Sequence, residues 1–285
     1  MLDLRSTLNG FGIADVQNLY DAGEIAAINE ALDPHFARLD HQHRSYALST
    51  DLVRLGISDT ILSDKLVSAL FEIMSDPVFY HFHVYEIRSR QSEPHVESAI
   101  LSGWHRDFDS SYTEHSPSHI SLFVYLTHVG PEDGAFEFMP DLPQGAFRNH
   151  DKVIQERGDI GHGFFWNRYF YHRASPNRGT VRRRVLKLSI QKSSFPSSNL
   201  ETEYLREMAA AMMGRDAARK GLFGAYSPQD YPTIILGESG LQYSRPETNM
   251  EVHLSPLAVL KAQARDAYLA MKRRTSPSGT AANYD

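Results

Sequence analysis

The chain of 285 residues contains no cysteine. This absence excludes disulfides, a thiolate nucleophile, and zinc or iron–sulfur sites built on cysteine. The sequence also lacks an apolar run near the ~20 residues that span a bilayer, and its N-terminus lacks the apolar core of a signal peptide. The net charge is −6, so the basic excess that neutralises phosphates is missing as well. We therefore expect a cytoplasmic protein that binds neither membranes nor nucleic acid.

The segment Trp104-His105-Arg106-Asp107 carries the clearest chemical pattern in the chain. Side chains two positions apart in an extended segment point to the same face, so His105 and Asp107 would project together. With one more histidine, such a pair makes the facial triad of non-haem Fe(II) oxygenases, which leaves metal positions open for cosubstrate and oxygen. A His-x-Asp pair is common by chance, so this interpretation depends on finding the partners.

Hydrophobic spacing predicts a mainly β protein with flanking helices. Residues 11–13 are expected to form a short strand, and residues 20–36 and 64–74 two helices that pack outside a sheet. From residue 78 the pattern becomes strand-like, with segments rich in Phe, Tyr, Val and Ile. These segments lie at residues 78–90, 103–108, 120–128, 135–139, 160–166, 170–172 and 183–191. Strands of this number and length favour a β-sandwich or jelly roll.

The β pattern stops near residue 193. Residues 200–219 predict a helix whose Met and Leu stripe is typical of a packing surface, and residues 256–274 predict a last helix. We expect a jelly-roll domain at residues 1–194 and a helical, irregular extension at residues 195–275 that packs on it. The extension would act as a lid or as a homodimer contact. The composition of residues 276–285 indicates a disordered tail.

A third ligand must be chosen among several histidines, namely His115, His119, His128, His150, His162 and His172. His172 has the best context, because it ends the strand-like run of residues 164–171 and precedes a turn and another strand. That last strand divides by parity, with Leu186 and its i+2 neighbours on a face suited to helix packing. Arg183 lies on the other face, where a guanidinium could grip a carboxylate through two hydrogen bonds. The residues alone leave open whether this Arg triplet is instead a solvated strand end.

Taken together, these motifs resemble the phytanoyl-CoA dioxygenase-like branch of the Fe(II)/2-oxoglutarate dioxygenases. The resemblance covers residues 10–192. The motifs, in order, are Gly10-Phe11-Gly12, Glu24-Ile25-Ala26-Ala27, Trp104-His105-Arg106-Asp107, Glu132-Asp133-Gly134-Ala135 with Pro140, Gly158-Asp159, and His172…Ser175-Pro176-Asn177…Arg183. The family's arginine follows its distal histidine by about eleven positions, which is the interval from residue 172 to residue 183.

By this resemblance His105, Asp107 and His172 would bind Fe(II). Arg183 would hold the far carboxylate of 2-oxoglutarate, with Ser175 and Phe123 beside the cosubstrate and O2 as the second cosubstrate. Two departures are present, because Ala174 replaces the family's serine and Asp141-Leu142-Pro143 replaces its Gly-Ser-His. The first puts minor cosubstrate contacts in question, and the second affects the rim of the cavity.

The resemblance implies oxidation of a small-molecule metabolite or natural-product intermediate with release of succinate and CO2. Asp107 stands where halogenating relatives have Gly or Ala, so hydroxylation, desaturation or ring formation is favoured. The aromatic residues predicted to line the cavity are Trp104, Phe108, Tyr112, Phe138 and Trp166. The alternatives are a non-catalytic jelly-roll binding module and a cupin-type metal isomerase, and neither would need an arginine anchor.

Overall fold

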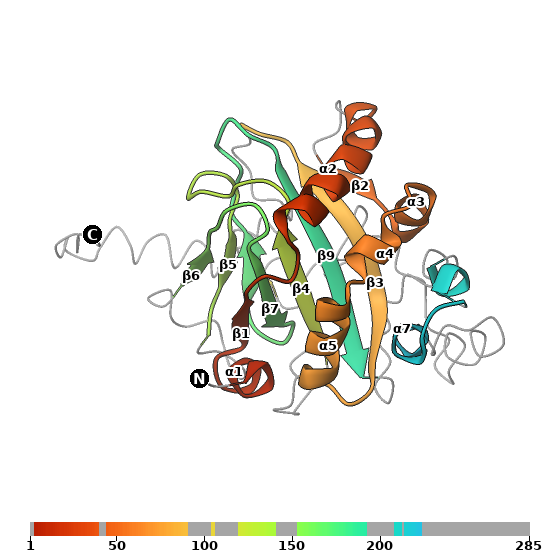
Figure 1. Cartoon of the computed structure of the whole chain (residues 1–285). Coiled ribbons are helices and arrows are strands. Elements are labelled where there is room, and N and C mark those ends of the chain that lie inside the picture. The colour runs from red at the N-terminus through yellow and green to blue at the C-terminus, as the bar shows by residue number, and fades with distance from the viewer. Residues whose placement is uncertain are drawn as a thin grey trace, which may run out of the picture.

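Two antiparallel sheets form the centre of the protein. The computed structural model describes residues 3–39, 44–90, 104–105, 119–140, 153–192, 208–212 and 214–223. The larger sheet has the order β1 (Ile13–Val16), β7 (Gly163–Asn167), β4 (His119–Tyr125), β9 (Arg183–Lys192), β3 (Pro77–Ile87) and β2 (Arg44–Ala47). The smaller sheet has the order β6 (Ile154–Glu156), β5 (Phe136–Phe138) and β8 (His172–Ala174). Strands distant in sequence are thus neighbours in space (Figure 1).

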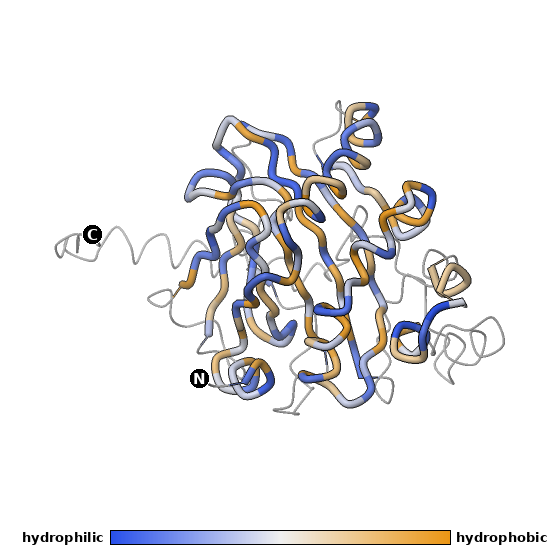
Figure 2. The backbone as a smooth tube through the Cα atoms, viewed as in Figure 1, coloured by the Kyte–Doolittle hydropathy of each residue, from blue (hydrophilic) through white to orange (hydrophobic). Residues whose placement is uncertain are grey.

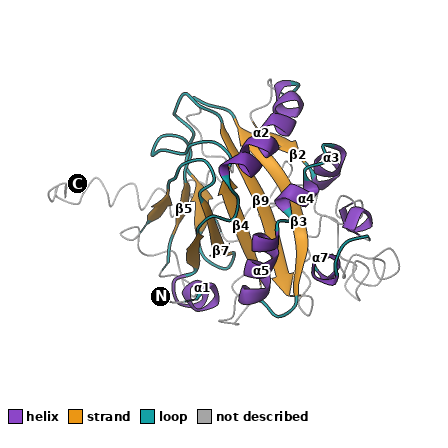
Figure 3. Ribbon diagram, in the orientation of Figure 1, coloured by secondary structure: helices purple, strands orange, loops and turns teal. Residues whose placement is uncertain are grey.

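Helices cover the outer face of the larger sheet (Figure 3). They are α1 (Leu4–Phe11), α2 (Ala22–Ala37), α3 (Ser49–Arg54), α4 (Ser58–Ile61), α5 (Asp64–Ile73) and α7 (Ala217–Gly221), and residues 208–212 are helical too. The predicted helices at 20–36 and 64–74 correspond to α2 and α5. Asp21 and Glu24 form a reciprocal capping box at the start of α2, and Ser63 accepts the Leu66 N–H at the start of α5.

The apolar sides of the helices and the outer face of the sheet form one core. Ile28, Leu32 and Leu70 of the helices belong to the same buried cluster as Leu122 and Leu188 of the sheet. This confirms the parity argument for β9, because its alternate leucine and isoleucine residues pack against helices. Figure 2 shows hydrophobic residues recurring along these strands, and hydrophobic and hydrophilic residues interspersed along the helices. Met208, Ala209 and Met212 join the same cluster, so the described part of the C-terminal extension packs on the core.

A second, aromatic core lies on the inner face of the larger sheet, against the smaller sheet. Phe123, Phe164 and Trp166 come from the larger sheet and Phe136 from the smaller one. Their ring centroids are 5.0 to 5.7 Å apart. Such tilted and edge-on contacts combine a large buried area with favourable ring electrostatics. The inner face of the larger sheet is therefore covered by a closely packed aromatic cluster.

Two sequence predictions need correction. The strand expected at residues 11–13 starts only at Ile13, because helix α1 runs to Phe11 and Gly12 ends it at φ +78°. A Cβ at Gly12 would also lie 2.8 Å from the Phe138 ring. The helix expected at 200–219 is interrupted, because residues 214–216 form a turn and Asp216 caps α7. The helix predicted at 256–274 and most of the strand at 103–108 lie outside the described residues.

Within the described residues, no helix combines the length and the hydrophobicity needed to cross a bilayer.

Candidate active site

Two of the three predicted iron ligands lie side by side although they are far apart in the sequence. His105 and His172 exchange two backbone hydrogen bonds, at 3.1 and 3.0 Å, as an isolated antiparallel bridge. Their imidazole ring centroids are 4.3 Å apart. The backbone bridge sets both side chains on one side of the pair. The structure therefore brings together two groups of the type that binds iron.

The orientation of the His172 ring is fixed by its surroundings. Its Nδ1 lies 3.0 Å from the carbonyl oxygen of Phe170, and because a carbonyl only accepts, Nδ1 carries the proton. This tautomer makes Nε2 the nitrogen with the lone pair, which is the usual arrangement behind a metal-binding imidazole. The ring lies 4.1 Å from Trp166 and is stacked on Phe136 at 5.6 Å. His172 is thus held as a ligand of defined direction.

The position of His172 in its strand differs from the prediction. Strand β7 ends at Asn167, a turn follows, and His172 begins β8 instead of ending a strand. The reason is local, because Phe170 N–H and Tyr169 N–H both bond back to Asn167, to its carbonyl and its side chain. This turn moves the chain from the larger sheet to the smaller one, and the histidine is the first residue after the crossing.

Arg183 is the cationic group of the site, and it is fully buried at 0% exposure. Its Nη2 donates to the hydroxyl oxygen of Tyr85 at 2.8 Å, and its Nη1 donates to the carbonyl of Gly134. Its Nε has no hydrogen-bond partner, and none of the carboxylates in the described ranges pairs with it. A buried cation without an anion is costly, so this position is suited to a carboxylate ligand.

Gly134 supports the arginine through the turn that precedes β5. Its φ is +76°, and a Cβ would lie 3.0 Å from the Ser175 carbonyl and 3.1 Å from Asn177. Only glycine takes this conformation without strain, so the turn depends on this residue. Two residues further on, Phe136 contacts His172. The arginine anchor and the histidine pair are therefore linked by one short segment.

Phe123 lies between the two parts of the site. Its ring is 6.1 Å from Tyr85, the partner of Arg183, and 5.2 Å from Phe136, the neighbour of His172. Ser175 is placed differently, because its hydroxyl donates to the Ala135 carbonyl at 3.0 Å and so ties two strands of the smaller sheet. Phe123 therefore lies between the partner of Arg183 and the neighbour of His172, and Ser175 bonds to the backbone around the site.

The predicted cavity aromatics divide into three groups. Trp166 touches His172, and Phe138 stacks on Phe136 and Phe170 within the aromatic core. Trp104 is buried in a separate cluster with Met139, under the guanidinium of Arg173 at 4.7 Å. Phe108, Tyr112 and the predicted iron ligand Asp107 lie outside the described residues.

Two residues of the site were missed from the sequence. Tyr85 orients Arg183, and burial beside Phe123 places its ring under the guanidinium, 5.4 Å away. Phe136 connects the histidines to the arginine turn. Nothing in the sequence around either residue marks it as part of the site, since any aromatic at an inward-facing strand position would give the same pattern. Cross-strand register from β3 to β9 was the missing information.

Comparison with known proteins places this chain in a family. The model of the phytanoyl-CoA dioxygenase (PhyH) family matches residues 8–185. AviO1 from Streptomyces viridochromogenes Tue57 is similar in structure, with a TM-score of 0.56 and 13% identity over 68% of this chain and 96% of that chain. HygX from Streptomyces hygroscopicus, solved with nickel and 2-oxoglutarate bound, has a TM-score of 0.54 and 12% identity over 67% and 87% of the two chains.

A third similar structure is the alpha-ketoglutarate-dependent epimerase SnoN from nogalamycin biosynthesis. It has a TM-score of 0.50 and 19% identity over 67% of this chain and 82% of that chain. A search of curated proteins gives no match to the chain. At these identities the solved structures establish the fold alone, and that fold is the predicted jelly roll.

The double-sheet jelly roll with a paired histidine and a buried arginine agrees with the fold and the residue types expected of a 2-oxoglutarate-dependent oxygenase. The family match spans more than half of the sequence, so the chain belongs to the phytanoyl-CoA dioxygenase (PhyH) family. It is thus an Fe(II)- and 2-oxoglutarate-dependent dioxygenase, an oxidoreductase that uses O2.

Proposed function

We propose that the protein oxidises a C–H bond of a small natural-product intermediate, with His105, Asp107 and His172 holding Fe(II) and Arg183 holding 2-oxoglutarate. The reaction would be hydroxylation, or a related two-electron oxidation such as desaturation or ring formation. One atom of O2 enters the succinate formed as 2-oxoglutarate loses CO2, and the other enters the product or leaves as water. The buried guanidinium of Arg183 is the observation that carries this proposal, because it lacks a counter-anion among the described residues.

Arg183 supplies binding and orientation. A distal carboxylate bound by its guanidinium would gain charge-assisted hydrogen bonds in a site from which water is excluded. Tyr85 and the Gly134 carbonyl fix the plane of the guanidinium, so the cosubstrate would meet a donor set of constant geometry. Arginine suits this role better than lysine because its donors are rigid and match a carboxylate in pairs.

The histidine pair supplies fixed nitrogen ligands. His172 donates its Nδ1 proton to the Phe170 carbonyl, which holds the ring in one direction and raises its basicity toward a metal. Asp107 would be the third, anionic ligand by its place in the motif. When bound, Fe(II) would supply the activation of O2 that no side chain of the protein can provide.

The aromatic core keeps the site dry. Phe123, Phe136 and Trp166 are almost completely buried and lie between or beside the histidines and the arginine. Excluding water strengthens the hydrogen bonds to a bound carboxylate and protects reactive species from solvent. The substrate class rests on structural neighbours, since SnoN acts in nogalamycin biosynthesis and SnoK, of the same biosynthesis, is a carbocyclase.

The proposal can be tested by measuring substrate-dependent succinate release. A panel of natural-product intermediates is incubated with Fe(II), 2-oxoglutarate and O2, and succinate and oxidised product are quantified together. We expect one panel member to stimulate succinate release in equal amount to product, and His172→Ala to abolish both. Conversion of a compound without consumption of 2-oxoglutarate would contradict the proposed reaction and favour isomerase chemistry.

A further inference from the structure

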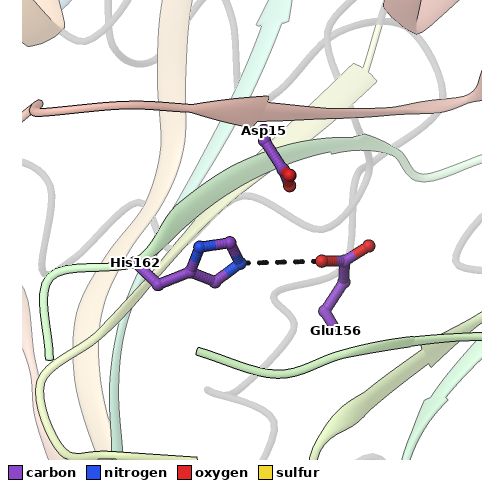
Figure 4. Close-up of side chains that lie close together, drawn as sticks. All are labelled: Asp15, Glu156 and His162. Atoms are coloured by element: carbon purple, nitrogen blue, oxygen red, sulfur yellow. Dashed lines mark ion pairs between the residues drawn. The ribbon is translucent and has the colours of Figure 1, made fainter. Parts of the chain in front are cut away.

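A second group of metal-ligating side chains lies away from the iron and 2-oxoglutarate residues, at the edge strand of the larger sheet. Asp15 of β1, Glu156 of β6 and His162, just before β7, each offer one ligand atom, and these atoms all lie within 4.8 Å of one another. Figure 4 shows the two carboxylates and the imidazole pointing into the same space from three segments. The site assigned above uses none of these residues.

The backbone holds the three side chains in place. Asp15 pairs with Phe164 in the β1–β7 ladder, and the Tyr125 hydroxyl donates to the Glu156 carbonyl at 2.9 Å. His162 is fixed by two backbone bonds, because its carbonyl accepts from Tyr125 at 2.9 Å and its N–H donates to Asp159 at 3.0 Å. The arrangement thus exists before any ligand arrives, which lowers the cost of binding one.

A glycine makes room for the imidazole. An ideal Cβ at Gly158 would lie 2.4 Å from Cγ of His162, so any side chain there would displace the ring. The ring also lies 5.9 Å from Tyr125 and 5.7 Å from Phe164. The direction of the His162 side chain is therefore set by packing, and it leads toward Glu156.

The three side chains carry two carboxylates and at most one positive charge, on the imidazole. Glu156 and Asp15 are both acids, and within the described chain neither forms an ion pair with a lysine or arginine. Side-chain exposure is only 13% at Glu156 and 17% at His162, so water screens these two poorly. Partial burial of the Asp15 carboxyl, followed by the nearby Glu156 carboxylate, raises the pKa of Asp15 above its ordinary value. A cation would relieve this repulsion.

The imidazole nitrogen that faces the acids has no hydrogen-bond partner in the described residues. Nε2 of His162 is buried and lies 3.6 Å from Oε2 of Glu156, which is within the range of an ion pair with a protonated imidazole (Figure 4) but beyond hydrogen-bond range. The same separation is close to the ~3.4 Å edge of a tetrahedron of ligands placed ~2.0–2.2 Å from Zn²⁺. The observed spacing therefore also suits two ligands of one ion.

We propose that Asp15, Glu156 and His162 form a second divalent-cation site, separate from the iron site, that takes a transition metal such as Zn²⁺. One imidazole and two carboxylates form a mixed nitrogen and oxygen donor set that zinc accepts. The exposed side chain of Asp15 leaves the site open to water for the remaining coordination position. The ion would tie edge strand β1 to the segment between β6 and β7.

Zinc content of the tag-free full chain tests this proposal independently of activity. Bound Zn²⁺ is measured by mass spectrometry after equilibrium dialysis, in wild type and in a His105→Ala/His172→Ala background that lacks two iron ligands. We expect about two zinc ions per chain in wild type and about one in the background, falling to none when Asp15→Asn is added. Asp15 is exposed and asparagine has the same shape, so this variant should fold, as circular dichroism would verify.

His128→Ala is the matched control, because His128 is an exposed neighbour that pairs with Asp159 at 2.9 Å. In the background it should leave zinc content unchanged, whereas His162→Gln should remove it. A second readout is thermal unfolding, where saturating Zn²⁺ should raise the midpoint of the background by ~5 °C but leave its Asp15→Asn form unmoved.

A background that binds no zinc would overturn the proposal and leave the iron site intact. A background that still binds about two ions, one of them lost with Asp15→Asn, would support the second site and show instead that the iron ligands were assigned wrongly. Zinc content and midpoint that do not respond to Asp15→Asn would also overturn it.

Discussion

Arg183 and Arg184 are neighbours on β9, yet they lie in opposite environments. Arg183 points into the inner, aromatic layer, where its partners are a hydroxyl and a carbonyl. Arg184 points to the outer layer, where Glu86 and Asp33 neutralise it at 2.8 Å each. Strand alternation alone separates the two. The comparison teaches that a buried arginine already paired with acids is part of the architecture, whereas one without an acid is prepared for a ligand.

The largest effect should come from the inner layer, at the histidine pair. His105→Ala should lower turnover by on the order of 100-fold or more, because one of the proposed iron ligands is lost. Its side chain is only partly buried, so the unfolding midpoint should change little. Turnover and iron content measured on the same preparation check this. Turnover within a few-fold of wild type would show that His105 is not a ligand.

Arg183→Ala should raise the concentration of 2-oxoglutarate needed for half-maximal succinate formation by ~10- to 100-fold. The variant loses charge-assisted hydrogen bonds to a carboxylate, which contribute about 1.5–3 kcal/mol. The 2-oxoglutarate requirement of Arg183→Lys should fall between those of wild type and Arg183→Ala, because lysine keeps the charge but not the paired donors. Steady-state kinetics with varied 2-oxoglutarate measures this. An unchanged requirement in both variants would refute the role of the inner arginine.

Arg184→Met should act on stability and leave the 2-oxoglutarate requirement unchanged. The substitution removes the Arg184 partner of Glu86, whose side chain is 5% exposed. Arg182 still pairs with the other carboxylate oxygen of Glu86 at 2.9 Å. We expect a loss of about 2–3 kcal/mol in the free energy of unfolding, since the buried Glu86 carboxylate keeps only one of its two arginine partners and its charge is less well compensated. Urea unfolding of the variant and wild type measures this loss. A large rise in the 2-oxoglutarate requirement would erase the distinction between the two faces.

The loss in Arg184→Met should depend on pH. Burial raises the pKa of Glu86 above its ordinary 4.5, while Arg184 opposes that rise, so the variant shifts it further upward. A carboxyl whose folded pKa is raised destabilises the protein progressively as pH rises through that pKa. The difference from wild type should therefore be largest at pH 7 and shrink toward pH 4.5, as urea unfolding across this range would show. A difference independent of pH would argue for lost packing.

Arg182→Ala should have the smallest effect. Its side chain is 30% exposed, and it shares Glu86 with the better buried Arg184. We expect a loss of less than about 1 kcal/mol and no change in the 2-oxoglutarate requirement. A shift in that requirement as large as the one in Arg183→Ala would contradict the parity argument for β9.

The sequence predicted the parts of this protein that depend on local pattern. Alternation in residues 183–191 correctly assigned Leu188 to the helix-packed face and put Arg183 on the opposite face, because strand geometry forces successive side chains apart. The burial of Arg183 in the structure decides against the solvated strand end that the residues alone had left open. The helices predicted at 20–36 and 64–74 correspond to α2 and α5, which begin at Ala22 and Asp64. Short elements such as β2, β6, α3 and α4 were missed, because a few residues carry too little periodicity.

The rest of the site depends on contacts between distant segments. Nothing near Tyr85 in the sequence indicates that its hydroxyl will meet Arg183, 98 positions later. His172 was chosen from its place before a turn and a strand, and the family resemblance agreed with that choice. Nothing near His162 in the sequence indicated that it would lie with Asp15 and Glu156. The interruption after residue 212 was also missed, although Gly214 and Asp216 are ordinary signals of a helix end and a new cap.

The most direct test of the central claim is an anaerobic titration of the protein with Fe(II) and 2-oxoglutarate, followed by visible absorption. Binding of both at one site should produce a weak metal-to-ligand charge-transfer band, absent in His105→Ala and requiring ~10- to 100-fold more 2-oxoglutarate in Arg183→Ala. A wild-type chain that gives no band, or an equal band in all three proteins, would contradict the assignment of iron to the histidine pair and of 2-oxoglutarate to Arg183.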